Sequence, residues 1–239
     1  MKNVIKYIFR FFKLVLIKEK NYFNAEENLY KSLKFNNIGA VIDVGAHQGK
    51  FIKNIFKFFK FIKVISFEPI KKEFKNLSET SNKYKNWKIY NYALGANNEK
   101  KEINISNYTE ASSLLNIENK LLQFRPELKT QAKETIECKK LDNFIDEFSN
   151  LKKPILLKID TQGYEMEVLK GADKTLQIID FILLEVSIVQ NYVGQPTLKE
   201  ILIYLENKNF KVVSLDRVFG DRLTGETYQV NILFSRKLN

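Results

Sequence analysis

The sequence predicts an α/β protein built on a mostly parallel, doubly wound sheet. From about residue 40 onward, short apolar runs alternate with helical stretches, which is typical of repeated βα units. A chain of 239 residues is long enough for one domain with a sizeable core, but not comfortably for two. Seven runs have the length and composition of strands: Ala40–Val44, Phe61–Phe67, Trp87–Tyr92, Ile155–Ile159, Phe181–Val186, Lys211–Leu215 and Gln229–Phe234.

The first 20 residues are basic and rich in aromatic side chains. Lys13 interrupts the apolar run and no small-residue cleavage site follows, which argues against a secretory signal. The segment is also too charged to cross a bilayer, which takes about 20 apolar residues. We therefore expect a basic amphipathic helical extension at residues 1–36 and one domain at residues 37–239. The extension either touches an anionic membrane surface through residues 1–20 or packs on the domain or a partner subunit.

The net charge of +11 is spread along the chain as lysine. Lys53, Lys57 and Lys60 form one stripe on an otherwise apolar helix, most simply a solvated face. Asparagine, isoleucine and phenylalanine are also abundant, as a coding sequence rich in A and T would produce, so we expect no nucleic-acid partner. One cysteine, Cys138, excludes an intramolecular disulfide and fits a reducing cytosol. We expect a cytoplasmic protein, with contact at the inner face of the membrane left open.

The first expected strand runs into a turn that suits a ligand. Asp43 lies near the strand end, and Gly45 and Gly49 follow with three residues between them. Glycines let the backbone approach a ligand closely, and a helix opening at Lys50 directs free N–H groups toward it. The spacing is Gly-x-x-x-Gly rather than Gly-x-Gly-x-x-Gly, which disfavours a dinucleotide pyrophosphate.

The second strand ends on an acid. Glu68 follows Gly49 by 19 residues, and an acid at that place in an α/β sheet can bind both hydroxyls of a ribose. The alternative is a helix cap ahead of Pro69. Together with the glycine turn, Glu68 favours a site for a nucleoside that carries a charged tail.

The later elements complete the sheet. Residues 99–142 are irregular and are expected to be an insertion that overhangs the ligand edge, with Cys138 packed in a short strand. Thr197 and Glu200 have the spacing of a capping box, and the last two strands are expected to pair antiparallel through a loop. The fourth strand is the most informative, because its apolar run ends on Asp160, turns through Gly163 and continues with Glu165 as a short helix.

Seven short motifs follow one another along the chain. They are Asp43-Val-Gly-Ala-His-Gln-Gly49, Phe67-Glu-Pro69, Asn91-Tyr-Ala-Leu-Gly95, Ser112-Ser-Leu114, Leu141-Asp142, Lys158-Ile-Asp-Thr-Gln-Gly-Tyr-Glu165 and Leu169-Lys-Gly-Ala172. Together they resemble the FkbM family of S-adenosylmethionine-dependent methyltransferases. The resemblance covers about residues 38–190, and its most specific block is the one around Asp160.

The resemblance implies a Rossmann-like class I methyltransferase fold with the last of seven strands antiparallel. It also implies S-adenosylmethionine as the cofactor, with the turn after Asp43 at its methionine portion, Glu68 at the ribose and the segment from Asn91 at the adenine. Asp160, Glu165 and Glu185 would then be the catalytic candidates near the methyl group, together with Tyr164. The implied cofactor-binding set is Asp43, Gly45, Ala46, His47, Gly49, Phe67, Glu68, Pro69, Asn91, Ala93 and Asp160.

Methyl transfer to a hydroxyl requires alignment of the acceptor oxygen and removal of its proton. Asp160 is the first candidate for that base or for the group that orients the acceptor. A carboxylate with a pKa near ~4 is a weak base unless burial raises that pKa. Alternatively, Asp160 and Glu185 hold a divalent cation, although no metal site is assigned. In the structural alternative, Glu165 caps the helix and Glu185 pairs with a lysine.

We therefore expect an O-methyltransferase that acts on a hydroxyl of a sugar, a cell-surface glycan or a secondary-metabolite precursor; the sugar rests on the resemblance. One rival is an NAD-dependent oxidoreductase on a similar sheet, which the glycine spacing disfavours. Another is a nucleic-acid methyltransferase or a basic binding module, which the dispersed charge disfavours. His47, the one histidine, is expected to be a hydrogen-bonded loop residue rather than a base.

Overall fold

The computed structural model describes residues 25–221 and 223–237, so the segment at residues 1–20 lies outside the described residues. A seven-stranded sheet has the strand order β3-β2-β1-β7-β8-β10-β9. β10 runs antiparallel to both of its neighbours, and the pairs among β3, β2, β1, β7 and β8 are parallel. The predicted sheet is thereby confirmed. Its strands are β1 (Ala40–Val44), β2 (Lys63–Phe67), β3 (Trp87–Tyr90), β7 (Ile155–Ile159), β8 (Phe181–Ser187), β9 (Phe210–Gly220) and β10 (Thr227–Arg236).

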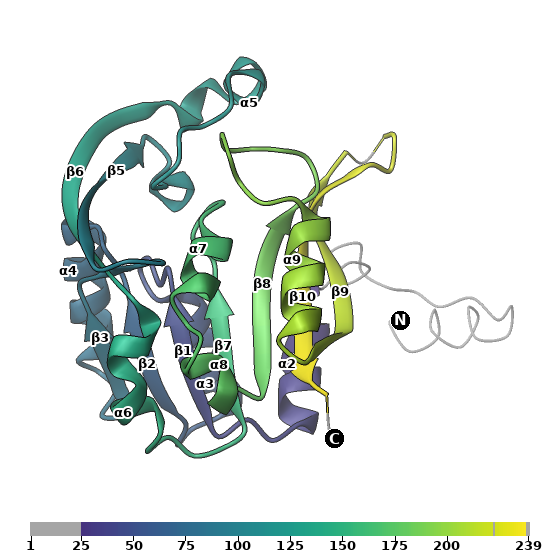
Figure 1. The fold of residues 1–239 in the computed structure, drawn as a ribbon. Helices are drawn as coiled ribbons and strands as arrows, with labels where there is room; N and C mark the ends of the chain where they lie inside the picture. Colours follow the sequence, from purple (N-terminus) through teal and green to yellow (C-terminus); the bar gives the residue numbers. More distant parts are fainter. Residues whose placement is uncertain (1–24, 222, 238–239) are drawn as a thin grey trace, which may run out of the picture.

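Helices cover both faces of this sheet (Figure 1). Successive strand residues point to opposite faces, so Val41 packs with one set of helices and Ile42 with the other. The first set is α2 (Ala25–Phe35), α3 (Lys50–Phe58) and α4 (Lys71–Ser81). The second set is α6 (Ile145–Phe148), α7 (Glu165–Lys170), α8 (Thr175–Ile178) and α9 (Leu198–Asn207). Leu33 of α2 is fully buried, so the described part of the expected extension packs on the domain.

The expected insertion forms a second sheet that rises above the carboxyl ends of the strands (Figure 1). This sheet has the order β4-β6-β5 and includes β4, which precedes residue 99. Cys138 is buried in this sheet, which confirms the prediction that it packs within a strand. The elements are β4 (Ala93–Leu94), β5 (Glu99–Ser106), η2 (Thr109–Ala111), α5 (Asn119–Phe124), η3 (Pro126–Leu128), β6 (Thr130–Lys139) and η4 (Leu141–Phe144).

Some element boundaries differ from the prediction. β2 begins at Lys63 instead of Phe61, and the loop expected from Asp216 to Tyr228 is strand up to Gly220 and again from Thr227. Asp216 and Arg217 pair with β10 although they are polar, because an edge strand needs no continuous apolar pattern to form its ladder. The capping box is confirmed: Thr197 Oγ1 accepts from Glu200 N at 3.3 Å and Glu200 Oε2 accepts from Thr197 N at 2.7 Å.

None of the helices within residues 25–221 and 223–237 is long and apolar enough to cross a membrane.

Candidate functional site

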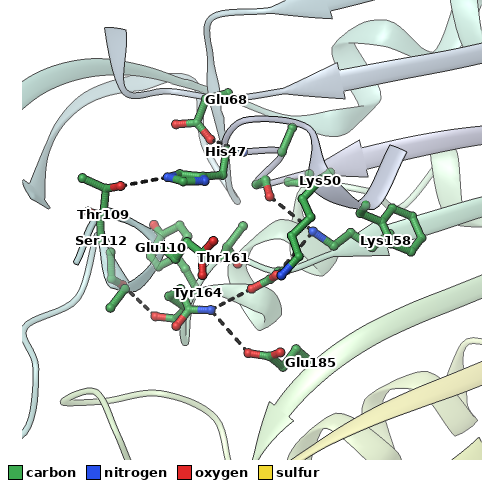
Figure 2. A pocket seen from close by; sticks show the side chains of 18 of the residues that line it. His47, Lys50, Glu68, Thr109, Glu110, Ser112, Lys158, Thr161, Tyr164 and Glu185 are labelled. Atoms are coloured by element: carbon green, nitrogen blue, oxygen red, sulfur yellow. Dashed lines mark hydrogen bonds and ion pairs between the residues drawn. The ribbon is translucent and has the colours of Figure 1, made fainter. Parts of the chain in front are cut away.

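A cavity of about 790 Å³ lies between the carboxyl ends of the strands and the insertion. Eight of the predicted site residues line it: Gly45, Ala46, His47, Glu68, Pro69, Ala93, Asp160 and Glu185. The other five lie behind its wall: Asp43, Gly49, Phe67, Asn91 and Glu165. Figure 2 shows how several of the lining side chains converge from the turn after β1, the insertion, β7 and β8.

The two glycines of the first turn serve different contacts. Gly45 has a φ of 78°, and a Cβ there would overlap the backbone oxygen of Asp160. Gly49 has a φ of 75°, and a Cβ there would overlap the ring of Trp87. Gly45 therefore lets the turns after β1 and β7 meet at the cavity, whereas Gly49 fits the start of α3 against the core.

Glu68 is fixed at the end of β2 by two backbone donors. Its Oε2 accepts from His47 N at 2.8 Å, and its Oε1 accepts from Ile70 N at 2.9 Å. Ile70 is the N-cap of α4, so the contact expected from the capping alternative is present, yet the carboxyl also lines the cavity. Burial raises the pKa of Glu68 to about 7. Each oxygen retains a lone pair for a ligand hydroxyl.

Asn91 and Phe67 support this wall from behind. Asn91 Nδ2 donates to the backbone oxygens of Glu68 at 2.8 Å and of Pro69 at 2.9 Å. Phe67 is fully buried and stacks on Tyr90 with ring centroids 5.3 Å apart. Both residues therefore position Glu68 and Pro69 and do not face the cavity.

His47 connects the turn to the insertion. Its Nε2 lies 2.8 Å from Thr109 Oγ1 (Figure 2). The same atom lies 3.4 Å from Glu73 Oε2. The residue has a φ of 48°, in the left-handed region that a side chain seldom adopts without local support. These contacts are those of a hydrogen-bonded loop residue.

A buried ion-pair network lies beneath the turn. Lys158 Nζ is 3.3 Å from Asp43 Oδ1 and 3.3 Å from Asp160 Oδ2, and it donates to Gly45 O at 3.3 Å. Asp43 is fully buried, and its Oδ2 accepts from Ser66 Oγ at 3.1 Å. Burial raises the pKa of Asp43, while the ammonium of Lys158 opposes that rise. Asp43 thus holds Lys158 rather than facing a ligand.

Lys158 also lines the cavity, and sequence reasoning did not single it out. Burial disfavours its charge, but the carboxylates of Asp160 and Asp43 outweigh burial and leave the pKa of Lys158 raised. The available signal was a lysine in the middle of an otherwise apolar buried strand, because such a charge requires a partner.

Asp160 follows β7, Glu185 lies near the end of the neighbouring strand β8, and the two carboxylates share one amide. Gln162 Nε2 donates to Asp160 Oδ1 at 2.8 Å and to Glu185 Oε1 at 3.4 Å (Figure 2). Glu185 Oε1 also accepts from Gln229 Nε2 at 2.9 Å. Burial raises the pKa of Glu185 to about 8; the charge of Asp160 adds to this effect and Lys158 opposes it.

Gln162 and Tyr192 join this pair to the insertion. The Tyr192 hydroxyl lies 3.0 Å from Gln162 Oε1 and 3.0 Å from Ala111 O, and it can donate to either. Ser113 Oγ donates to Gln162 O at 2.7 Å. Sequence reasoning missed both Gln162 and Tyr192. Gln162 stood inside the most specific motif, but no sequence signal pointed to Tyr192.

Glu165 fixes the loop from beneath. Its Oε1 accepts from Thr161 N at 2.9 Å, Thr161 Oγ1 at 3.1 Å and Gly163 N at 3.1 Å. Burial raises the pKa of Glu165 to about 7. Glu165 opens α7 and lies outside the cavity wall, and its partners precede the helix, so it holds the loop and does not cap the helix as the structural alternative expected.

Amides surround Glu185 in the cavity. Gln162 and Gln229 donate to it, and Asn231 is its partner on β10. Asn54 and Asn191 also line the cavity, as do apolar and aromatic residues that include Tyr30, Phe51, Leu183, Val218 and Phe219. Amides both donate and accept, so the surroundings of Glu185 can bind a polyol without requiring an ionic group on it.

Within the described part of the chain, no group of three or more His, Cys, Asp or Glu side chains is placed to hold a metal ion.

Comparisons with known proteins give relatives of this chain. The family model of the methyltransferase FkbM domain matches residues 43–212. Methyltransferase 1 of Beauveria bassiana (strain ARSEF 2860) is 24% identical over 171 residues, which cover 66% of this chain and 69% of that protein.

Two crystal structures of the methyltransferase domain of bacterial CtHen1 share the fold. One has a TM-score of 0.52 at 9% identity, covering 89% of this chain and 96% of that one. The other has a TM-score of 0.51 at 10% identity, covering 87% and 96%. The sheet order and these likenesses identify a Rossmann-like class I methyltransferase fold.

Proposed function

Because the chain belongs to the methyltransferase FkbM domain family, we propose that it uses S-adenosylmethionine to methylate a hydroxyl of a sugar or glycan precursor. The observation that carries the proposal is one continuous cavity with two chemically distinct ends. One end has the Gly45 turn and Glu68, and the other has Glu185 among amides. A nucleoside donor and a polyol acceptor fit these two ends.

The residues of the first end fit S-adenosylmethionine. Gly45 leaves room for close backbone approach, and the start of α3 directs free N–H groups to the same place. Glu68 is already oriented by two backbone donors and has lone pairs for the two ribose hydroxyls. Pro69, Ile70, Ala93 and Leu94 line the adjoining wall, where an adenine would lie. When bound, the cofactor supplies an electrophilic methyl group.

At the second end, Glu185 is the group suited to accept the proton of the acceptor hydroxyl. A base works best when its pKa is close to the operating pH, and the pKa of Glu185 is raised to about 8. Asp160 is ion-paired to Lys158 and half-exposed, so it suits orientation of the acceptor better than proton removal. Sequence reasoning placed the base first at Asp160, with orientation of the acceptor as its other role; this assignment moves the base to Glu185 and leaves Asp160 as the orienting group.

The experiment that tests the function combines a binding titration with a product screen. The purified protein should bind S-adenosylmethionine, and incubation with cell-surface glycan precursors should yield a product heavier by one methyl group. Binding of NAD without binding of S-adenosylmethionine would support the oxidoreductase instead. If RNA or DNA were methylated and no sugar acceptor reacted, the acceptor would be a nucleic acid and not a sugar or glycan precursor.

Glu68→Ala is expected to weaken S-adenosylmethionine binding by roughly 100-fold or more. Two hydrogen bonds to a charged acceptor contribute about 1.5–3 kcal/mol each. Isothermal titration calorimetry measures the affinity, and the melting temperature checks that the fold persists. An affinity within threefold of the wild type would mean that Glu68 only caps α4.

A further inference from the structure

The fold gathers lysines that are dispersed in the sequence. Residues ahead of parallel strands meet at the edge opposite the ligand site, which is the lower edge of the sheet in Figure 1. Exposed lysines precede each of the four adjacent strands β3, β2, β1 and β7. We call these residues the basal lysines: Lys34, Lys57, Lys60, Lys63, Lys83, Lys85 and Lys152.

The loops that carry the basal lysines lie side by side. Ala40 pairs with both Lys63 and Ile155, so the starts of β2 and β7 flank the start of β1. Gly39 N donates to Pro154 O at 2.8 Å. On the other side, Tyr84 stacks on Phe56 with ring centroids 4.4 Å apart, which holds the loop before β3 against α3.

Carboxylates near this surface, such as Asp180 and Glu147, pair with other lysines. In the parts of the chain that the structure describes, the basal lysines form no ion pair, whereas the exposed Lys153 in the same region pairs with Asp180 at 3.7 Å. The stretches 28–42, 44–67, 80–98 and 148–159 contain no Asp or Glu. Acids line the ligand cavity instead, including Glu68, Glu110 and Asp160. The cavity lining also contains the bases Lys50, Arg125 and Lys158, so acids and bases are mixed there, whereas the basal lysines have no carboxylate partner among the described residues.

Two phenylalanines protrude from the same edge. Phe35, at the end of α2, is 89% exposed, and Phe61, just before β2, is 88% exposed. Phe58, at the end of α3, is 47% exposed. Large apolar side chains with this exposure, set among uncompensated lysines, have the chemistry of an interfacial membrane anchor.

We propose that the basal lysines, with Phe35 and Phe61, dock the protein on an anionic phospholipid surface. Lysines near such a surface are attracted by its negative potential, and phenylalanine rings partition into the boundary between head groups and acyl chains. A nucleic-acid backbone would satisfy the lysines but would leave the two rings in water. Docking through this edge leaves the ligand cavity open on the opposite side, toward the aqueous phase. The proposal does not depend on the reaction.

Flotation of the full-length protein with vesicles of phosphatidylcholine, with and without phosphatidylglycerol, tests the proposal. Binding is expected only when phosphatidylglycerol is present. A triple variant of the basal lysines should reduce the partition coefficient roughly 100-fold, because each lysine contributes about fivefold. A matched triple variant replaces exposed, unpaired lysines of the insertion and α9, and should stay within twofold of the wild type. The test variant carries K57Q, K60Q and K63Q, and the control carries K120Q, K129Q and K199Q.

A second pair of variants separates the apolar contribution from the charge. Phe35→Ser with Phe61→Ser should lower binding at high salt, where electrostatic attraction is screened. Phe124→Ser replaces a ring in the insertion that is 74% exposed, and this control should leave vesicle binding at high salt unchanged.

Three results would overturn the proposal. The first is wild-type protein that does not float with anionic vesicles. The second is a basal triple variant that floats as well as its control, which would assign any membrane binding to residues outside this surface. The third is retention on RNA or DNA that competes away vesicle binding and is lost in the same triple variant, which would make a nucleic acid the partner. Because flotation needs no methyl transfer, failure of the proposed reaction leaves each result interpretable.

Discussion

Glu185→Gln is expected to lower turnover by roughly 10²- to 10⁴-fold, the usual contribution of a positioned general base. The substitution keeps the shape of the side chain and an oxygen for the amides of Gln162 and Gln229, but it cannot accept the acceptor's proton. S-adenosylmethionine affinity should be unchanged, since Glu185 lies at the other end of the cavity. Single-turnover kinetics with a methylated-product readout measures the effect. If Glu185→Gln retained half of the wild-type turnover, the assignment of Glu185 as the general base would be wrong.

The pH dependence gives an independent check of the same assignment. A base acts in its ionised form, so with a pKa of about 8 the wild-type kcat/KM should rise as pH increases through 8 and fall below it. Asp160→Asn is the informative companion, because the charge of Asp160 helps to raise the pKa of Glu185. That variant should lose turnover and show its rise at lower pH. If the pH profile of Asp160→Asn matched that of the wild type, the charge of Asp160 would not be influencing the pKa of Glu185.

Lys158→Met is expected to lower the free energy of unfolding by about 3–5 kcal/mol, the cost of leaving a buried charge without its partner. Asp43 is fully buried, and its Oδ1 has no other cation than Lys158 among the described residues. Urea denaturation measures the change. The matched control is Lys170→Met, which removes an exposed pair with Glu167 at 2.7 Å and should cost less than about 1 kcal/mol.

The same variant should regain stability in acid. The folded-state pKa of Asp43 is raised above its ordinary 3.8, so its contribution to stability is fully present below 3.8 and is lost as pH rises through the folded value. Without Lys158 that raised pKa moves further up, and the loss relative to wild type should be smaller at pH 5 than at pH 8. The double variant Asp43→Asn/Lys158→Met should recover much of the loss at pH 8. An equal loss for single and double variants would mean that the pair is not the cause.

The central strands were predictable because both of their faces are covered. Every residue of β1 and of β7 is buried, so each strand is an apolar run broken only by Asp43 or Lys158, which pair with each other, and such a run is easy to recognise in sequence. β9 lies at the edge of the sheet, where Val212 and Leu215 are half-exposed beside polar neighbours, so its length was underestimated. Errors in the predicted ends of strands thus occur where the residues are partly exposed, because burial no longer requires them to be apolar.

The site was predictable where function follows from position along a strand. Glu68 and Asp160 directly follow parallel strands and Glu185 lies near the end of β8, and the carboxyl ends of these strands meet at one edge of the sheet. Whether a side chain at that edge enters the cavity depends on the pleat, so Asp43 turns into the core beneath Lys158 while Asp160 faces the cavity. Tyr192 and Gln229 arrive from a loop and from the antiparallel strand, and their places become visible only after the chain is folded.

Three hydrogen bonds join the insertion to the reaction chemistry: Thr109 with His47, Ser113 with Gln162, and Ala111 with Tyr192. The insertion therefore cannot be exchanged for that of a relative without affecting the residues that it contacts. A chimera that carries the insertion of a relative would disturb the turn beside Glu68 and the amide between the two carboxylates at once. Transfer of acceptor preference between relatives consequently requires that the residues at positions 109 and 113 preserve their hydroxyls while the surrounding loop changes.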